Sequence, residues 1–147
     1  MTLPRRFLLL AALLLAGCQR QVQPVPAPPL PSAETSVVLR TNFGFNSYRL
    51  PPGAAAELDA LAQAMTTDPR LQSAQFEING HTDVTGRLGY NMGLSMLRAG
   101  AVVDALIARG VPAARLRPQG FGPLQLLDAN DPRSGANRRV EVVAHPM

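Results

Sequence analysis

The chain has 147 residues, which is enough for one domain, and its single Cys excludes an internal disulfide framework and a Cys-rich metal site. The nominal net charge is +4, but no run of basic residues and no basic helix face accompanies it, so a nucleic-acid partner is not expected. No apolar run approaches the roughly 20 residues of a membrane-spanning helix, which excludes a polytopic membrane protein.

Residues 1–17 are expected to be a secretory signal. Arg5 and Arg6 precede the apolar core 7–16 (FLLLAALLLA), which is too short to span a bilayer. The segment ends in Leu-Ala-Gly-Cys18, which resembles the bacterial lipobox, in which small residues precede a Cys that is acylated and becomes the new N-terminus. Removal of the signal leaves 12 of the 14 basic residues against 10 acidic ones, so the mature net charge is about +2.

Lipidation of Cys18 would tether the chain to a membrane, because acyl chains contribute roughly 0.8 kcal/mol per buried methylene and two or three of them anchor durably. Gln19 follows, where Asp would retain a lipoprotein in the inner membrane in enterobacteria-type sorting, so we expect the outer membrane. Residues 18–35 then form a Pro-rich linker that favours polyproline II and could reach on the order of 50 Å at about 3.1 Å per residue. A disordered tail without a spacing role remains the alternative.

Residues 36–147 are expected to fold as one α/β domain, an α+β sandwich. In chain order we predict a strand at 37–39, a helix from Pro51-Pro52 to about 68, a strand at 74–79, a polar loop at 80–89, a helix at 90–109, a strand at 115–120, a loop at 121–136 and a strand at 138–144. This order, β-α-β-α-β-β, predicts a mixed sheet with two helices on one face.

The helix at 90–109 carries a wide apolar stripe and ends before Gly110 and Pro112, which suit a helix C-terminus. We therefore expect truncation of Leu97, a stripe residue, to cost about 2–5 kcal/mol. The full stripe is Leu94, Leu97, Ala101, Val102, Ala105 and Leu106.

Four motifs in this domain belong together. They are NFGFN at 42–46, GHTDVTG at 80–86, NMGLSMLRA at 91–99 and NRRVE at 137–141, with Gly-Phe-Gly at 120–122 before the last loop. In this order and spacing they closely resemble the OmpA-like C-terminal domain, which OmpA, the peptidoglycan-associated lipoproteins (Pal) and flagellar stator proteins share. The resemblance covers essentially the whole folded part, and the lipobox and linker make the chain most similar to the Pal-like outer-membrane lipoproteins.

The resemblance implies non-catalytic binding of the peptidoglycan stem peptide, at the free end of meso-diaminopimelate. This end carries an ammonium and a carboxylate on one carbon, which a fixed carboxylate and a guanidinium fork can recognise together. The positions that match the family's assign Asp83 to the ammonium and Arg98 to the carboxylate. Thr82 and Asn91 are candidates for neutral hydrogen bonds, and Leu94 and Phe45 for walls around the methylene chain.

Asn46 departs from the family pattern, because Pal-like relatives commonly carry Asp there. The amide keeps the acceptor oxygen and loses the charge, so we expect looser binding of the ammonium or a shifted preference for stem chemistry.

Each candidate also has a purely structural interpretation. Asp83 could be a turn residue, Arg98 a solvated helix Arg and Asn91 a helix cap. We interpret His81 as structural, because no further His or Cys completes a metal site around it. Arg138 and its neighbour Arg139 point to opposite faces of a strand, so at most one can approach the ligand, and we expect the other at the surface or sheet edge.

Two other functions were considered. A peptidoglycan hydrolase needs a nucleophile with a base, an acid dyad or a zinc site, and the domain has no Cys, two separated His and no Ser in a nucleophile elbow, so neither an enzyme nor a cofactor is expected. An envelope or secretion-system interaction protein that uses the wall only as its anchor remains open, with Tol-type or other envelope proteins as partners. Because Asp83 and Arg98 are expected to face a ligand, we expect Ala variants of both to stay folded.

Overall fold

The computed structural model describes residues 35–39 and 42–147, so the signal, Cys18 and the linker up to residue 34 lie outside the described residues. The strands are β1 (Thr35–Val38), β2 (Gln75–His81), β3 (Leu116–Gly122) and β4 (Val140–His145), and the α-helices are α1 (Ala54–Thr67) and α2 (Leu88–Ile107). Two short 3-10 helices, η1 (Ala113–Arg115) and η2 (Gly135–Asn137), precede β3 and β4. The predicted element order is confirmed. Within these residues no helix is both long and apolar enough to cross a bilayer.

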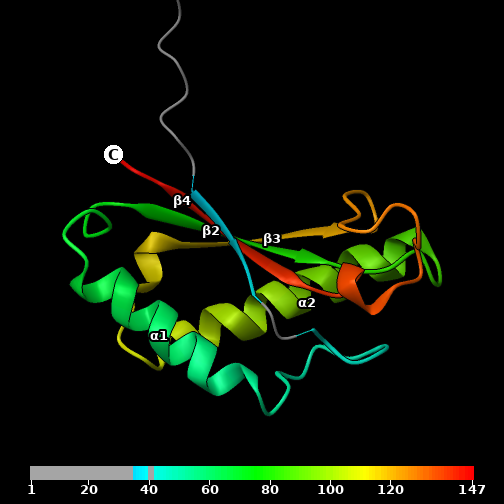
Figure 1. Cartoon of the computed structure of the whole chain (residues 1–147), viewed down its shortest axis with the longest axis horizontal. Helices are drawn as coiled ribbons and strands as arrows, with labels where there is room; N and C mark the ends of the chain where they lie inside the picture. Colours follow the sequence, from blue (N-terminus) through cyan, green and yellow to red (C-terminus); the bar gives the residue numbers. More distant parts are fainter. Residues whose placement is uncertain (1–34, 40–41) are drawn as a thin grey trace, which may run out of the picture.

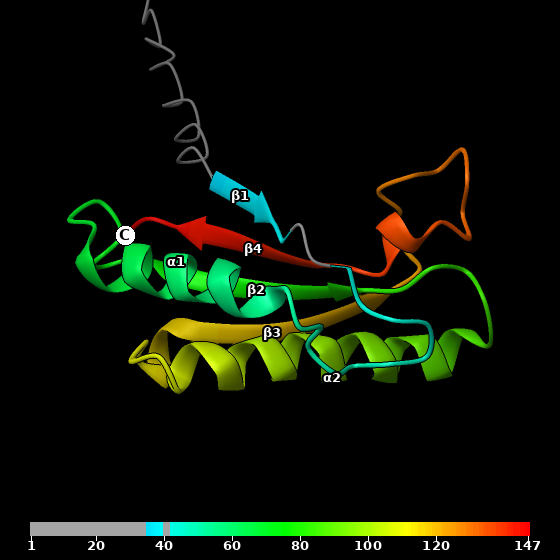
Figure 2. The same cartoon turned by 60° about the horizontal axis from the view of Figure 1, so that its bottom comes forward.

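The four strands form one mixed sheet in the order β1-β4-β2-β3. β2 pairs in parallel with β3 and antiparallel with β4, and β4 pairs antiparallel with β1. The parallel pair is joined through α2, because parallel strands need a crossover connection. Both helices lie on the same face of the sheet, as predicted (Figures 1 and 2).

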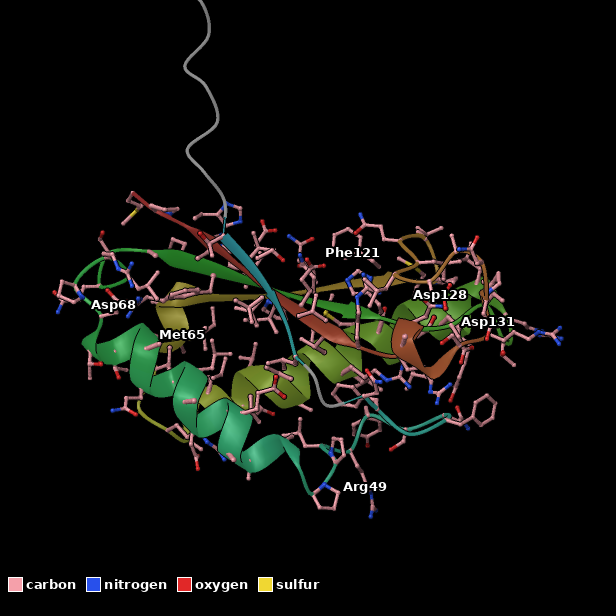
Figure 3. The ribbon with its side chains drawn as sticks, viewed as in Figure 1. Arg49, Met65, Asp68, Phe121, Asp128 and Asp131 are labelled. Atoms are coloured by element: carbon pink, nitrogen blue, oxygen red, sulfur yellow. The ribbon has the colours of Figure 1, made fainter. Side chains whose placement is uncertain are left out.

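One hydrophobic core lies between this face and the helices. Alternate residues of β2 and β4 point toward the helices and are buried, as the two-residue period of a strand requires. Met65 on α1 is fully buried against them (Figure 3). The core residues contributed by these elements are Leu58, Ala62 and Met65 of α1, Phe76 and Ile78 of β2, Ala99, Val102 and Leu106 of α2, and Val140, Val142 and Ala144 of β4.

Glycines allow α2 to lie directly against β2 and β3. A Cβ at Gly80 would stand 1.9 Å from the Ser95 carbonyl oxygen, and one at Gly120 would stand 2.7 Å from the Met96 nitrogen. No larger residue fits either position without moving the helix. The structure also corrects the predicted strand ends: β2 continues through Gly80 to His81, and β3 continues past Gly120 to Gly122, into the range 121–136 that was expected to be a loop.

The structure overturns the expectation for Leu97. Its side chain is 51% exposed, whereas Leu106 of the same stripe is fully buried. We therefore expect Leu106→Ala to lower the free energy of unfolding by about 2–5 kcal/mol and Leu97→Ala by less than about 1 kcal/mol. Urea denaturation of both variants measures the difference, and equal losses would contradict this placement of the two side chains.

Candidate ligand-binding site

A cavity of about 190 Å³ opens beside the N-terminal half of α2. It is enclosed by the segment before α1, the loop after β2, the first turns of α2 and the residue after η2. All seven residues that the sequence analysis proposed for ligand binding line this one cavity, so the structure brings them together. The lining consists of Phe45, Asn46, Thr82, Asp83, Thr85, Gly86, Tyr90, Asn91, Leu94, Arg98 and Arg138.

Arg98 is not a solvated helix residue, because its side chain is completely buried. Its guanidinium donates from Nε to the Ser47 carbonyl at 2.8 Å, from Nη1 to the His81 carbonyl at 2.9 Å and from Nη2 to the Gly44 carbonyl at 3.1 Å. Burial and the neighbouring Arg138 lower the pKa of Arg98 to about 10, so the group is still charged at neutral pH. A buried cation in this position gives the cavity a permanent positive charge.

Asp83 faces the cavity from the loop after β2. Its Oδ1 accepts the Thr85 backbone N–H at 2.8 Å, and its Oδ2 accepts Nη1 of Arg138 at 3.1 Å. Burial by itself would raise the pKa of Asp83, but the hydrogen bonds from Thr85 and Arg138 outweigh it and hold the pKa below its usual range. The carboxylate is therefore ionised and fixed in place before any ligand arrives.

The sequence did not show whether Arg138 or Arg139 reaches the cavity, and in the structure it is Arg138. Its Nε donates to the Phe43 carbonyl at 3.0 Å while Nη1 contacts Asp83. The preceding residue, Asn137, is fully buried and forms hydrogen bonds with five backbone groups between residues 127 and 132. These bonds hold the loop before Arg138 in place. Only one of the two Arg residues lines the cavity, as expected, but not because of alternation along a strand: β4 begins at Val140 and not at 138, so both Arg138 and Arg139 precede it.

Arg139 differs from its predicted place at the surface or sheet edge. It is only 4% exposed, donates to the Gln125 carbonyl and lies 3.8 Å from a carboxylate oxygen of Glu141. Its hydrogen bond to Gln125 links it to the loop before η2, and it does not line the cavity.

Thr82 and Asn91 have different roles at the cavity. The Thr82 hydroxyl is buried and has no hydrogen-bond partner within the described part of the protein. The Asn91 amide instead donates to the Thr85 carbonyl at 3.0 Å and so holds the loop that carries Asp83. The capping interpretation of Asn91 is wrong, since α2 begins at Leu88, one turn earlier.

The apolar and amide side chains border the cavity mouth. Leu94 is buried, whereas Phe45 is 67% exposed at the tip of its turn. Asn46, next to it, has a positive φ of 50°, a conformation that Asn adopts more readily than most residues, and its Oδ1 accepts the Tyr90 hydroxyl. The sequence analysis missed Tyr90, although its position four residues before Leu94 and eight before Arg98 puts it on the same helix face.

His81 is structural, as the sequence suggested. Its ring is fully buried and stacks on Phe121 with ring centroids 5.6 Å apart. Burial and the nearby Arg139 lower its pKa to about 4, although Glu141 acts in the opposite direction. Throughout the described residues, no group of three or more His, Cys, Asp and Glu side chains is placed to hold a metal ion.

Residues 42–139 match the OmpA family, and this range includes every residue of the cavity. The chain belongs to the OmpA family. The probable lipoprotein YiaD of Escherichia coli is 37% identical over 107 residues, which cover 71% of this chain and 48% of YiaD. The peptidoglycan-binding protein ArfA of Mycobacterium bovis is 36% identical over 105 residues, which cover 70% of this chain and 31% of ArfA.

Among solved structures, the peptidoglycan-associated lipoprotein of Burkholderia pseudomallei superimposes on this OmpA-family chain with a TM-score of 0.63 and 30% sequence identity. The match covers 83% of this chain and 99% of that structure. The chain therefore spans about half or less of the two curated relatives, but nearly all of the solved Pal chain.

The buried His81 should make the OmpA-family domain sensitive to mild acid. The unfolded chain binds a proton at this residue near pH 6.5 and the folded chain only near pH 4, so the free energy of unfolding should fall as the pH is lowered from 6.5 toward 4. The expected slope is at most about 1.4 kcal/mol per pH unit. Denaturant unfolding of wild type and His81→Gln between pH 7 and 5 measures it, and equal slopes would show that His81 is not the source.

The two charged site residues should differ in their effect on stability, which corrects the expectation that both Ala variants stay equally folded. Arg98→Ala removes a buried side chain and leaves three backbone carbonyls, including that of the buried His81, without their donor, so we expect a loss on the order of 3–5 kcal/mol. Asp83→Asn keeps an acceptor for Thr85 and loses only the charge pair, and it should cost about 1 kcal/mol. Thermal denaturation compares the variants, and an Arg98→Ala domain as stable as wild type would contradict the structural role.

Proposed function

We propose that this protein is a lipid-anchored outer-membrane protein whose domain binds the peptidoglycan stem peptide without catalysis, at the meso-diaminopimelate end, and so tethers the membrane to the wall. The observation that carries the proposal is that Asp83, Arg98 and Thr82 line one cavity, where the buried Thr82 hydroxyl has no hydrogen-bond partner among the described residues. A buried hydroxyl without a partner is costly, and a polar ligand would satisfy it.

Asp83 has capacity left for the ligand ammonium. An ionised carboxylate offers about four lone-pair sites, and the protein contacts at Asp83 use one on each oxygen. An ammonium can therefore bind beside the existing partners without displacing them.

Arg98 has capacity left for the ligand carboxylate. Three of its five N–H groups are used by backbone carbonyls, which leaves two for a ligand. Hydrogen bonds from a guanidinium to a carboxylate are charge-assisted and therefore stronger than neutral ones. Because the carbonyls already hold the guanidinium in place, binding costs little side-chain entropy.

Arg138 favours a ligand end that carries both an ammonium and a carboxylate over an end that carries an amine alone. With Arg98 it makes the cavity net positive, so a ligand that brings only an ammonium meets repulsion that a carboxylate on the same carbon relieves. Diaminopimelate carries this carboxylate, and the side chain of lysine does not.

The relatives support the biological setting. ArfA is named as peptidoglycan-binding, the solved Burkholderia protein as a peptidoglycan-associated lipoprotein and YiaD as a probable lipoprotein. The lipobox before Cys18 agrees with a lipid anchor, and the Pro-rich residues after it agree with a spacer between membrane and wall.

The decisive test is a titration of the purified chain, in lipid nanodiscs, with diaminopimelate-type and lysine-type stem peptides. We expect the lysine-type peptide and a peptide with the free carboxylate amidated to bind about 10- to 150-fold more weakly, the range for loss of a hydrogen bond to a charged group. Equal affinity for all three would overturn the roles given to Asp83 and Arg98.

Two variants test where the ligand ammonium binds in this titration. Asp83→Asn should weaken the diaminopimelate-type peptide while the fold is kept, because it removes the charge that pairs with the ammonium. Asn46→Asp should tighten the same peptide by adding a second carboxylate at the cavity mouth. Opposite changes would mean that the ammonium does not lie between these residues.

A further inference from the structure

The cavity continues into a groove along the exposed face of α2. Asn46, Tyr90 and Leu94 line both the cavity and the first section of the groove, which holds about 520 Å³. Tyr48, Met96 and Leu97 in turn line both this section and the next one, which extends to Asp104. A ligand in the cavity therefore has a continuous path along the helix.

The first section of the groove is apolar and uncharged. The described residues that line it include no Asp, Glu, Arg, Lys or His, and Tyr48, Tyr90 and Leu97 are each about half exposed. Large apolar side chains gathered on a surface usually mark a binding site, and Tyr supplies both an apolar ring and a hydroxyl. The groove is thus suited to a neutral ligand with apolar faces.

Glycines leave the backbone of α2 bare along this groove. A Cβ at Gly89, Gly93 or Gly100 would meet nothing within 4 Å, so packing inside the domain does not explain them. Gly in the middle of a helix is destabilising relative to Ala. Gly80 and Gly120 are different, because α2 lies too close to β2 and β3 for a side chain at either position. The bare positions allow a flat ligand to approach the helix closely.

We propose that this groove binds the N-acetylated sugars of the glycan strand when the stem peptide occupies the cavity, an inference that rests on the proposed function. The glycan is the part of the same polymer to which the stem is covalently attached. Its sugar rings are uncharged where the stem is joined, and they present C–H faces and acetyl methyl groups to apolar side chains. The chemistry of the groove matches this neighbour of the stem.

The distances agree with this path. Three extended residues span about 10 Å along the backbone, and the stem is longer than this because its bound end is the tip of the diaminopimelate side chain. The backbone part alone equals the rise of about seven residues of α-helix. Measured from Tyr90 at the cavity, the stem can therefore reach Leu97 or beyond, within the groove.

The test compares two probes, the tripeptide stem that ends in meso-diaminopimelate and the same stem carrying its N-acetylglucosamine–N-acetylmuramic acid disaccharide. We expect the disaccharide to improve the affinity of the full chain about tenfold, the order expected of two aromatic contacts. Calorimetric titration of the chain in lipid nanodiscs measures both dissociation constants.

Two variants alter the groove outside the cavity. Gly93→Gln adds a side chain at an open position of α2, and Tyr48→Ala removes a ring that does not line the cavity. Ala60→Gln, on the exposed face of α1, is the matched control. We expect both groove variants to lose the gain from the disaccharide and to bind the stem alone within about twofold of wild type, while the control keeps the gain.

The outcomes separate this inference from the proposed function. If wild type binds the stem but gains nothing from the disaccharide, or if the gain persists in both groove variants, the sugar site is wrong and the proposed function stands. If the gain appears only after deletion of residues 19–34, the groove receives the linker and the sugar site is again overturned. If the stem alone does not bind, the proposed function fails first.

Discussion

The three hydrogen bonds from the Arg98 guanidinium to the carbonyls of Gly44, Ser47 and His81 join the segments on which the cavity depends. One cation on α2 fixes the turn before α1 and the end of β2, and its guanidinium carbon lies 5.3 Å from the centroid of the Phe43 ring. A buried charge is tolerated only where such partners replace water. The same residue is therefore both the structural tie of the site and its source of positive charge.

Arg115 makes a similar tie at the other end of the domain. Its guanidinium donates to the carbonyls of Met65, Leu71 and Ala74, and lies 5.1 Å from the Phe76 ring. It joins the C-terminal part of α1 to the start of β2. Arg is suited to this use because its planar fork carries five donors and stays charged. The Arg115 tie stabilises the connection between α1 and β2, whereas the Arg98 tie also lines the cavity.

The motifs and the family resemblance that they carry were sufficient to predict the fold and seven of the residues at the cavity, but not Tyr90, nor how each residue is held. Helical spacing placed Leu94 and Arg98 on one face, yet it also put Leu97 in the core, because the spacing does not show that the sheet covers only the side bearing Leu94, Val102 and Leu106. The three carbonyl partners of Arg98 come from distant segments and depend on the tertiary fold. For the same reason the choice between Arg138 and Arg139 required the structure.

Preorganisation links these features to binding. Asp83 is fixed by Thr85 and Arg138, and Arg98 by three carbonyls, so neither charged group has to be ordered when a ligand enters. Affinity is gained chiefly by removing such ordering costs, and a rigid pair of opposite charges discriminates best against a ligand with only one of them. In the proposed function, the excess positive charge from Arg138 would add to this discrimination, since it would raise the cost of an ammonium that arrives without its carboxylate. A rigid cavity for the zwitterionic end and a permissive apolar groove beside it would then divide recognition of one polymer between its charged and its neutral parts.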